Sequence, residues 1–252
     1  MTELCVHTFS PFWGLPTTGP FALKLLAWLR YHTIPYRQIH EDRPSRGPYG
    51  KSPWITHDGL TLGDSDEIIR FLAQAHGLPD PTLCRTPAEV RNDALKLAFE
   101  ERFHQVLEWE MFLHPAGYSG MQALVGALAP PIVGPIILRQ MRRHFRGQLQ
   151  ARGVGRLPPD KIAQIGQRQL DGLALCLDDA GGWLGGDAPV LVDFACWGQI
   201  APMVAWPMET PVAGHAKSLA PVVEWHGAIL KRCFAPDIAC ADPEGRSPSV
   251  PA

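Results

Sequence analysis

Strand-like patterning is confined to the first 62 residues of this chain. Short apolar or alternating runs predict four β-strands, over residues 4–9, 36–39, 54–57 and 60–62. Asp58-Gly59 separates the last two runs, so together they predict a hairpin with a tight turn. After residue 78 only helical patterns occur, and we therefore expect a mixed α/β unit followed by an all-helical unit.

Two helices complete the first unit. Pro20 suits the first position of a helix, and the apolar residues that follow it have helical spacing as far as Leu29. A second helix is expected from Asp64 to His76, where Gly77 closes it. The predicted order of elements is therefore β-α-β-β-β-α.

The second unit is expected to be a helical bundle. Thr86-Pro87-Ala88-Glu89 has the residues of a capping box with proline at the first helical position, so a long helix should begin there and continue to His114. Further helices are expected over residues 160–179 and 190–206. The predicted organisation is a first domain over residues 1–77, a linker over 78–85, an all-helical domain over 86–235 and a disordered tail over 236–252.

The composition excludes several functional classes. The formal net charge is only -2 and the basic residues form no long run, so nucleic-acid binding is not expected, because it needs clustered Lys and Arg. The six cysteines make no C-x-x-C pair and the ten histidines have no ligand spacing, so no metal site or dithiol centre is expected. The N-terminal residues lack the features of a signal peptide, which favours a cytoplasmic location.

One apolar segment, from Ala123 to Leu138, carries no charge and is interrupted by three prolines. It is shorter than a membrane-spanning helix requires, so we expect a buried, broken helix pair or a pocket lid, and no membrane contact. Four arginines at helical spacing follow it and predict a solvated face, with a role at a pocket lip or an anionic surface as the alternative: Arg139, Arg142, Arg143 and Arg146.

The segment from Lys51 to Glu67 combines a strand edge with a helix start. Pro53 stands in a strand-like run, where proline is placed at a strand start or a bulge and is compatible with a cis bond. Asp64 followed three residues later by Glu67 predicts a capping box. A backbone edge beside a helix N-terminus can hold a peptide-like anion.

Three motifs resemble those of the glutathione S-transferase superfamily. The run from Gly50 to Ile55 (G-K-S-P-W-I) is similar to the G-K-x-P segment of that family, and Asp64-Ser65 is similar to its acidic-Ser pair. The run from Trp183 to Asp187, followed by Asp193-Phe194, looks like the L-x-G-D…A-D signature of its helical domain. Residues 19–24 (G-P-F-A-L-K) resemble the S-P-F-x-L-K opening of the metaxin and failed-axon-connections branch.

This resemblance implies a thioredoxin-like N-terminal domain and an all-helical C-terminal domain. It also implies glutathione as cosubstrate, an apolar electrophile as second substrate, a homodimer and a cytoplasmic role in detoxification. In the family, Pro53 would be cis and the Ser52 backbone would pair with the cysteinyl part of glutathione, beside Lys51. Ser65 would take the γ-glutamyl carboxylate and Asp64 the ammonium group; the alternative is that these two residues only cap the helix.

Activation of the glutathione thiol is a separate question. The family places a Ser, Cys or Tyr near the start of the first helix, and the matching position here is Gly19, which has no side chain. Thr18 is the nearest hydroxyl, and Thr17, Ser10 and the Trp13 indole are further donors. The threonines could equally shape only the turn, and the helix N-terminus alone could favour a thiolate.

Two functional hypotheses follow. One is a glutathione transferase, and the other is a metaxin-like binding module that keeps the fold without turnover. Four residues are candidates for an apolar second-substrate pocket, with core packing as an equal alternative: Trp109, Phe112, Tyr118 and Met121. Asp193 is expected to be a structural cap with half of its capping box absent, because Val190 stands where the family has Thr or Ser.

Overall fold

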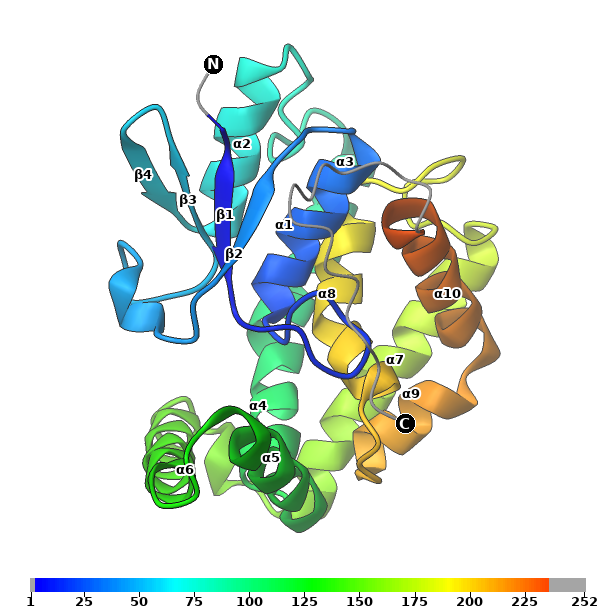
Figure 1. Ribbon diagram of the computed structural model, residues 1–252. Helices are drawn as coiled ribbons and strands as arrows, with labels where there is room; N and C mark the ends of the chain where they lie inside the picture. Colours follow the sequence, from blue (N-terminus) through cyan, green and yellow to red (C-terminus); the bar gives the residue numbers. More distant parts are fainter. Residues whose placement is uncertain (1–2, 236–252) are drawn as a thin grey trace.

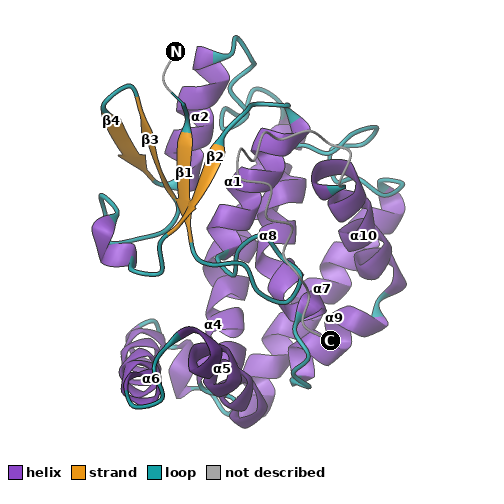
Figure 2. Cartoon of the chain, in the orientation of Figure 1, coloured by secondary structure: helices purple, strands orange, loops and turns teal. Residues whose placement is uncertain are grey.

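The computed structural model describes residues 3–235, so the predicted tail over 236–252 lies outside the described residues. Figure 2 shows that the strands gather at one side of the molecule and that helices make up the rest. Figure 1 shows that the N-terminal sheet and its helices lie beside a larger group of helices formed by the rest of the chain. This arrangement agrees with the predicted fold class.

The four strands form one mixed sheet in the order β2-β1-β3-β4. Their bounds are Cys5–Thr8 for β1, Arg37–His40 for β2, Trp54–His57 for β3 and Leu60–Gly63 for β4. β1 pairs in parallel with β2 and antiparallel with β3, and β3 and β4 form the predicted hairpin. The central strand β1 is almost completely buried, as its apolar composition predicts.

Helices α1 (Pro20–Tyr31) and α2 (Ser65–Ala75) complete the β-α-β-β-β-α order that the sequence predicts. α2 packs against α1 and against β3 and β4. A short 3-10 turn, η1 (Pro44–Arg46), precedes β3 and was not predicted. Residues 78–85 have neither helix nor strand and connect the first unit to the helices that follow.

The long helix predicted from Thr86 is present as three consecutive segments. These are α3 (Pro87–Leu97), the π-helical turn η2 (Ala98–Phe103) and α4 (His104–Phe112). The capping box forms as predicted, because the Glu89 amide donates to the Thr86 hydroxyl at 3.2 Å and the Thr86 amide donates to the Glu89 carboxylate at 2.8 Å.

The remaining helices build the bundle around a central buried one. They are α5 (Pro115–Leu128), α6 (Val133–Ala151), the 3-10 turn η3 (Val154–Arg156), α7 (Pro159–Asp179), α8 (Leu191–Ala205), α9 (Pro211–Ser218) and α10 (Ala220–Phe234). α7 and α8 confirm the helices predicted over residues 160–179 and 190–206. Other parts of the protein surround α8, and residues 191–203 are all buried. This agrees with the apolar sequence of the helix, which has no polar face.

α8 packs along α1, so the two predicted units share one hydrophobic core. Gly198 makes this close approach possible, because a Cβ there would lie 2.3 Å from the Pro20 carbonyl oxygen of α1. Asp193 caps α8 as expected: its carboxylate accepts from the Val190 and Leu184 amides, both at 2.9 Å, and from the Trp225 indole at 3.1 Å. Val190 contributes only backbone groups to this cap.

The apolar segment over residues 123–138 is a broken helix pair, as expected, but only part of it is buried: Leu124, Val125 and Leu138 are at most 8% exposed. α5 ends at Leu128 and α6 begins at Val133, with the prolines between them exposed. Ile132 is 81% exposed, and Val133 and Ile136 are also exposed. The prediction of burial was therefore wrong for the α5–α6 connection, which projects beyond the other helices, and right for the parts of α5 and α6 that pack inward. Within residues 3–235, no helix combines the length and the apolar character needed to cross a membrane.

Candidate functional site

Three segments meet at one edge of the sheet, beside the end of β1. They are the start of β3, the N-terminus of α2 and the N-terminus of α1. The strand register places His7, Trp54 and Gly63 in one row across β1, β3 and β4. Pro53 directly precedes this row on β3 and Asp64 directly follows it on β4, so both lie at the same edge. The end of β1 reaches the start of α1 there, because Phe9 would lie 3.1 Å from a Cβ at Gly19.

The first of these segments is the start of β3. The Ser52–Pro53 peptide is cis, as the resemblance implies. Pro53 is buried, Lys51 is exposed, and the Ser52 hydroxyl oxygen is buried without a hydrogen-bond partner among the described residues. Pro53 itself lies before the first ladder pair of β3, in agreement with the rule that proline is placed at strand starts.

The second segment is the N-terminus of α2. Asp64 is its N-cap, with one carboxylate oxygen accepting from the amides of Asp66 at 3.0 Å and Glu67 at 3.1 Å. The reciprocal half of the predicted capping box is missing, because the Glu67 carboxylate pairs with Arg70 instead. Asp64 has a φ of 69°, a conformation that costs an L-residue about 1–3 kcal/mol and that often occurs at functional sites.

Ser65 is the first residue of α2 and is 5% exposed. Its hydroxyl forms no hydrogen bond with another residue in the described part of the chain, and it stands at the positive dipole end of the helix. The Asp66 and Glu67 amides are taken by Asp64, so the Ser65 amide is the donor that remains beside this hydroxyl. An anion placed here would therefore meet unpaired donors. The cap formed by Asp64 and an anion site at Ser65 use different atoms, so the two interpretations are compatible.

The N-terminus of α1 is the third segment. Gly19 is the N-cap and provides no side-chain hydrogen bond, while Thr17 is fully buried and its hydroxyl accepts from the Gly19 amide at 3.3 Å. Thr17 therefore shapes the turn. Thr18 is half-buried, and its hydroxyl has no hydrogen-bond partner within residues 3–235.

The other predicted donors differ from Thr18 in their surroundings. Ser10 donates its hydroxyl to Asp42 at 2.7 Å and its amide to the same carboxylate at 2.9 Å, so it is engaged in the β1–α1 loop. Trp13 has a φ of 53° and packs edge-on against Trp206 of the helical bundle, with ring centroids 5.9 Å apart. Thr18 is thus the hydroxyl that the fold leaves available next to α1.

A buried network of ion pairs lies directly behind the α2 N-terminus and was not predicted from the sequence. Lys24 of α1, only 1% exposed, contacts Asp66 at 2.7 Å and Glu100 at 2.6 Å. Lys96 of α3 contacts the other Asp66 oxygen at 2.6 Å and Asp93 at 3.1 Å. The network joins both predicted units next to Ser65. The available signal was Lys24 itself, a charge within an apolar helical run, which is buried only when paired.

The network determines the ionisation of its carboxyl groups. Burial raises the pKa of Asp66, but the ion pairs with Lys24 and Lys96 outweigh it and hold that pKa below its usual value. Burial raises the pKa of Glu100, and the contact with Lys24 offsets this only in part. Asp66, contacted by both lysines, is therefore the carboxylate at the centre of the network.

The candidates for a second-substrate pocket are mostly core residues. Trp109, Phe112 and Met121 are at most 7% exposed, and Phe112 stacks on Phe145 with ring centroids 4.0 Å apart. Tyr118 is half-buried beneath the Arg142 guanidinium, 4.2 Å from its ring centroid. Of the four, only Tyr118 keeps a partly accessible ring.

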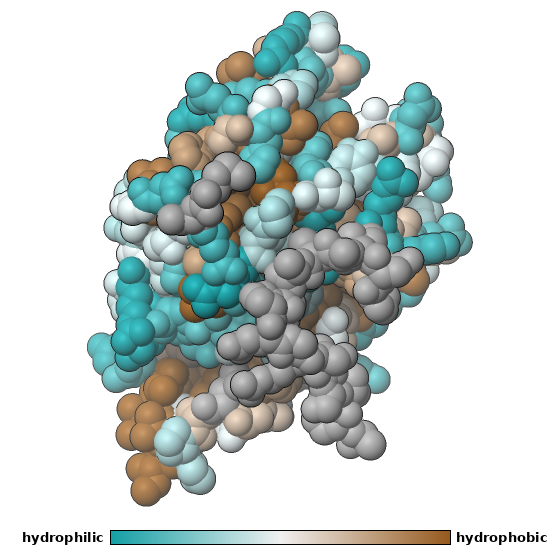
Figure 3. Space-filling model, turned by 45° about the horizontal axis from the view of Figure 1, so that its top comes forward, coloured by the Kyte–Doolittle hydropathy of each residue, from teal (hydrophilic) through white to brown (hydrophobic). Residues whose placement is uncertain are grey.

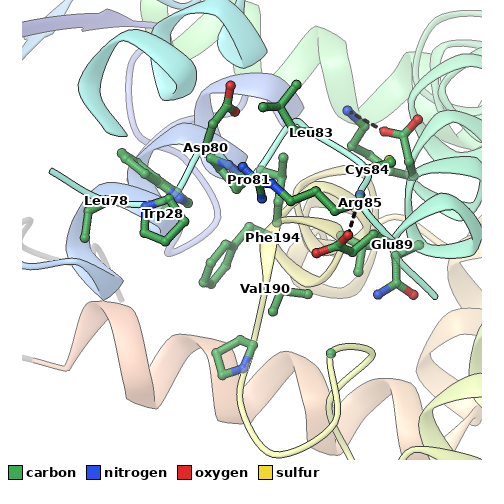
Figure 4. Close-up of a pocket in the computed structure, with 18 of the residues that line it drawn as sticks. Trp28, Leu78, Asp80, Pro81, Leu83, Cys84, Arg85, Glu89, Val190 and Phe194 are labelled. Atoms are coloured by element: carbon green, nitrogen blue, oxygen red, sulfur yellow. Dashed lines mark hydrogen bonds and ion pairs between the residues drawn. The ribbon is translucent and has the colours of Figure 1, made fainter. Parts of the chain in front are cut away.

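A separate groove of about 450 Å³ lies between α1, residues 78–85, α3 and the start of α8. Figure 4 shows Trp28, Phe194 and Val190 at this groove, with Cys84 and Arg85 above Val190. Thr18, Ser52, Asp64 and Ser65 do not line it. This groove is therefore distinct from the site that the sequence predicts.

Comparison with known proteins was consistent with the arrangement at the sheet edge. Residues 20–117 match the family model described as the glutathione S-transferase N-terminal domain. The chain is similar to isoprene-epoxide--glutathione S-transferase of Rhodococcus sp. (strain AD45), with 24% identity over 243 residues that cover 91% of this chain and 98% of the relative.

Two further comparisons concern the failed-axon-connections branch and the fold. The chain is 25% identical over 246 residues to Failed axon connections of Drosophila melanogaster, covering 91% of this chain but 57% of that longer protein. It also superimposes on the crystal structure of glutathione transferase F2 from Populus trichocarpa with a TM-score of 0.55 and 15% identity, over 90% of this chain and 93% of the other. The latter likeness establishes a shared fold.

Proposed function

We propose that this chain is a member of the glutathione S-transferase superfamily, since residues 20–117 match the N-terminal domain model of that family, and that it binds glutathione and transfers the glutathione thiolate to an apolar electrophile. The observation that carries the proposal is the convergence at one sheet edge of the α1 N-terminus, the Ser52–Pro53 peptide and the Asp64-Ser65 pair. These groups offer complementary partners to a tripeptide with two carboxylates, one ammonium group and one thiol.

Each group has a proposed role in binding. The Ser52 backbone pairs with the cysteinyl part of glutathione as an added strand, and Lys51, exposed beside it, offers a charge to the glycine carboxylate. The Ser65 amide and hydroxyl take the γ-glutamyl carboxylate at the N-terminus of α2, where the helix dipole favours an anion. The Asp64 carboxylate oxygen that does not cap α2 takes the ammonium group.

The proposed role of the α1 N-terminus is to favour the thiolate form of the glutathione thiol. A free thiol has a pKa of about 8.5, and a helix N-terminus together with a hydroxyl donor lowers that pKa. Thr18 is the proposed donor, because Thr17 and Ser10 are already engaged. If a Thr18→Ala variant formed conjugates at the original rate, Thr18 would have no role and the helix terminus would act alone.

A small apolar epoxide is the electrophile class that we propose, since the Rhodococcus relative is named for isoprene epoxide. The thiolate attacks one ring carbon, a C–S bond forms and the C–O bond to that carbon breaks. The ring oxygen stays bonded to the other carbon as an alkoxide and takes a proton from water to become a hydroxyl, so no oxidant or reductant is needed.

We further propose that the protein is a cytoplasmic homodimer that acts in detoxification, with its domain boundary in residues 78–85. The outer surface of β4 and α2 supports the dimer, because Leu60 is 41% exposed and Phe71 beside it is partly exposed. Sedimentation of the wild-type protein and of a Phe71→Ser variant tests this, and a monomeric wild-type protein would contradict it.

Thermal unfolding with and without glutathione tests the binding proposal. Ligand at 100 times its Kd should add roughly 2.7 kcal/mol to the free energy of unfolding. We expect millimolar glutathione to raise the Tm, and we expect S-methylglutathione, which cannot form a thiolate, to do the same. A Tm that neither ligand changes would overturn the proposal.

Turnover separates an enzyme from a non-catalytic binding module. Formation of the glutathione conjugate of a small epoxide and of a chlorinated aromatic compound should be measured with the same preparation. Conjugation above the uncatalysed rate supports the transferase. Binding without conjugation of either compound would favour the metaxin-like module, for which Gly19 is the supporting observation.

A further inference from the structure

The connection between α5 and α6 exposes an unusual set of apolar side chains. Ile132 is 81% exposed, Ile136 55%, Val133 44% and Ile137 39%, and the prolines at 130, 131 and 135 beside them are exposed as well. Figure 3 shows hydrophobic residues gathered on a projection at its lower left, the corner where α6 lies in Figure 1. We call residues 130–137 the apolar tip. Because it protrudes, it is not a groove that could receive a helix or a peptide.

The apolar tip continues into a row of positive charge. Residues 132, 136, 139, 143 and 146 recur every three or four positions and share one exposed face of α6. This row consists of Ile132, Ile136, Arg139, Arg143 and Arg146. The opposite face of α6 packs inward through Leu138 and Leu149. The helix is therefore held by its own core contacts while its outer face carries isoleucines and then arginines.

No acidic residue balances these arginines nearby in the sequence. Residues 111–159 contain six arginines and neither Asp nor Glu, although the whole chain has a net charge of -2. Arg142 lies over the Tyr118 ring, and Arg152 contacts Glu108 at 3.4 Å. Arg139, Arg143 and Arg146 form no ion pair with any residue in the described part of the chain. Three exposed guanidinium groups thus remain available to an external anion.

We propose that this face binds the surface of an anionic phospholipid bilayer, with the apolar tip among the first acyl carbons and Arg139, Arg143 and Arg146 against lipid phosphates. A convex apolar tip followed by unpaired arginines has the form of an interfacial membrane-binding helix. Each arginine near an anionic surface is worth about a fivefold gain in binding. The sequence disfavoured membrane contact because residues 123–138 are too short to span a bilayer and contain prolines. A helix that lies at the bilayer surface does not span it, and Ile132 and Ile136 are exposed.

The bilayer fits this face better than a second copy of the chain would. Two copies that met through their apolar tips would leave the arginine rows without acidic partners on this face, because residues 111–159 contain neither Asp nor Glu. An anionic lipid surface supplies negative charge along the full length of the row. The face is also separate from the proposed glutathione site, so the two proposals can fail independently.

Vesicle flotation of the full-length protein tests the proposal. We expect binding to vesicles of equal parts phosphatidylglycerol and phosphatidylcholine, and at least tenfold weaker binding to pure phosphatidylcholine. An Ile132→Ser/Ile136→Ser variant should lose most binding, and an Arg139→Gln/Arg143→Gln/Arg146→Gln variant should bind at least tenfold more weakly and with less dependence on salt. A matched control on α7, Leu175→Ser/Arg168→Gln, replaces a 71% exposed leucine and an exposed arginine and should bind like wild type.

Circular dichroism and thermal unfolding report whether each variant is folded. Wild-type protein that binds neither vesicle, or binds both equally, overturns the proposal. It is also overturned if folded tip variants bind as well as the α7 control does. If sedimentation without lipid shows that the isoleucine variant alone becomes monomeric, and wild-type protein does not float with anionic vesicles, the face is a contact between copies instead.

Discussion

Lys24 of α1 forms an ion pair of 2.7 Å with Asp66, the residue that follows Ser65 in the first turn of α2. Because Lys24 is 1% exposed, this pair rigidly couples the two helices whose N-termini meet at the proposed glutathione site. Lys96 and Glu100 extend the coupling into the helical bundle. The packing of the two units therefore helps to position Ser65.

Loss of the Lys24 charge should destabilise the protein strongly. A Lys24→Met variant leaves the Asp66 and Glu100 carboxylates without their shared partner, and breaking a buried pair in this way costs about 3–5 kcal/mol. Urea denaturation measures the difference, and Lys161→Met on the exposed start of α7 is the control. A loss below about 1 kcal/mol would show that the network contributes little.

Removal of the Ser65 hydroxyl should weaken glutathione binding without harming the fold. Hydrogen bonds to charged groups contribute about 1.5–3 kcal/mol, so Ser65→Ala should raise the Kd by roughly tenfold or more. Calorimetric titration measures this, with Thr82→Ala in residues 78–85 as the control. If the Kd of Ser65→Ala equals that of wild type, the γ-glutamyl carboxylate does not bind at this hydroxyl.

The free energy of unfolding should decrease as the pH is lowered from neutral to mildly acidic, because of His226. This side chain is buried and its Nδ1 accepts from the Trp197 indole at 3.1 Å, and burial lowers its pKa from 6.5 to about 4. Between these values the unfolded chain binds a proton that the folded one does not, so the free energy of unfolding should decrease as the pH falls, by roughly 3 kcal/mol at most.

Urea denaturation from pH 7 to pH 4.5 measures that dependence. A His226→Gln variant keeps an acceptor for Trp197 but cannot gain the proton, so the difference between wild type and variant isolates the histidine. The carboxyl groups that burial affects, such as Glu110 and Asp193, are present in both proteins. A difference that does not change with pH would contradict the prediction.

Gly198→Ala should perturb the α1–α8 contact. The added Cβ would lie 2.3 Å from the Pro20 carbonyl oxygen, so α1 must shift at its N-terminus, and such overpacking costs about 1–3 kcal/mol. The Tm and the rate of conjugation should both decrease. Gly172→Ala on α7 meets nothing within 4 Å and should leave stability equal or raise it by about 0.5–1 kcal/mol. Equal behaviour of the two variants would contradict this account.

Local interactions explain which parts of the fold could be predicted. The β3–β4 hairpin, the Thr86 capping box and the Asp64 cap each depend on residues within a few positions of one another. The residue types at these positions indicate the local backbone conformation, so these features can be predicted from a single sequence. The residues of the proposed site, Thr18 and the two segments at Ser52 and Ser65, were also identified from such local motifs.

Contacts between distant residues explain what could not be predicted. Ser10 was a candidate donor, but its partner Asp42 is 32 residues away. Segment 123–138 reads as buried because apolar composition does not reveal whether another element covers it, and its Ile132 is in fact 81% exposed. The Lys24–Glu100 ion pair joins positions 76 residues apart.

The sequence by itself thus determined the β-α-β-β-β-α order of the first unit, the caps at Asp64 and Thr86 and the motifs on which the proposed glutathione site rests, because these follow from neighbouring residues. Only the tertiary structure decided that Ser10 and Thr17 are engaged while Thr18 is available. It also decided that Lys24 is buried against Asp66 and that the apolar tip is exposed. These outcomes depend on which distant surfaces pack together, and that is a property of the whole core.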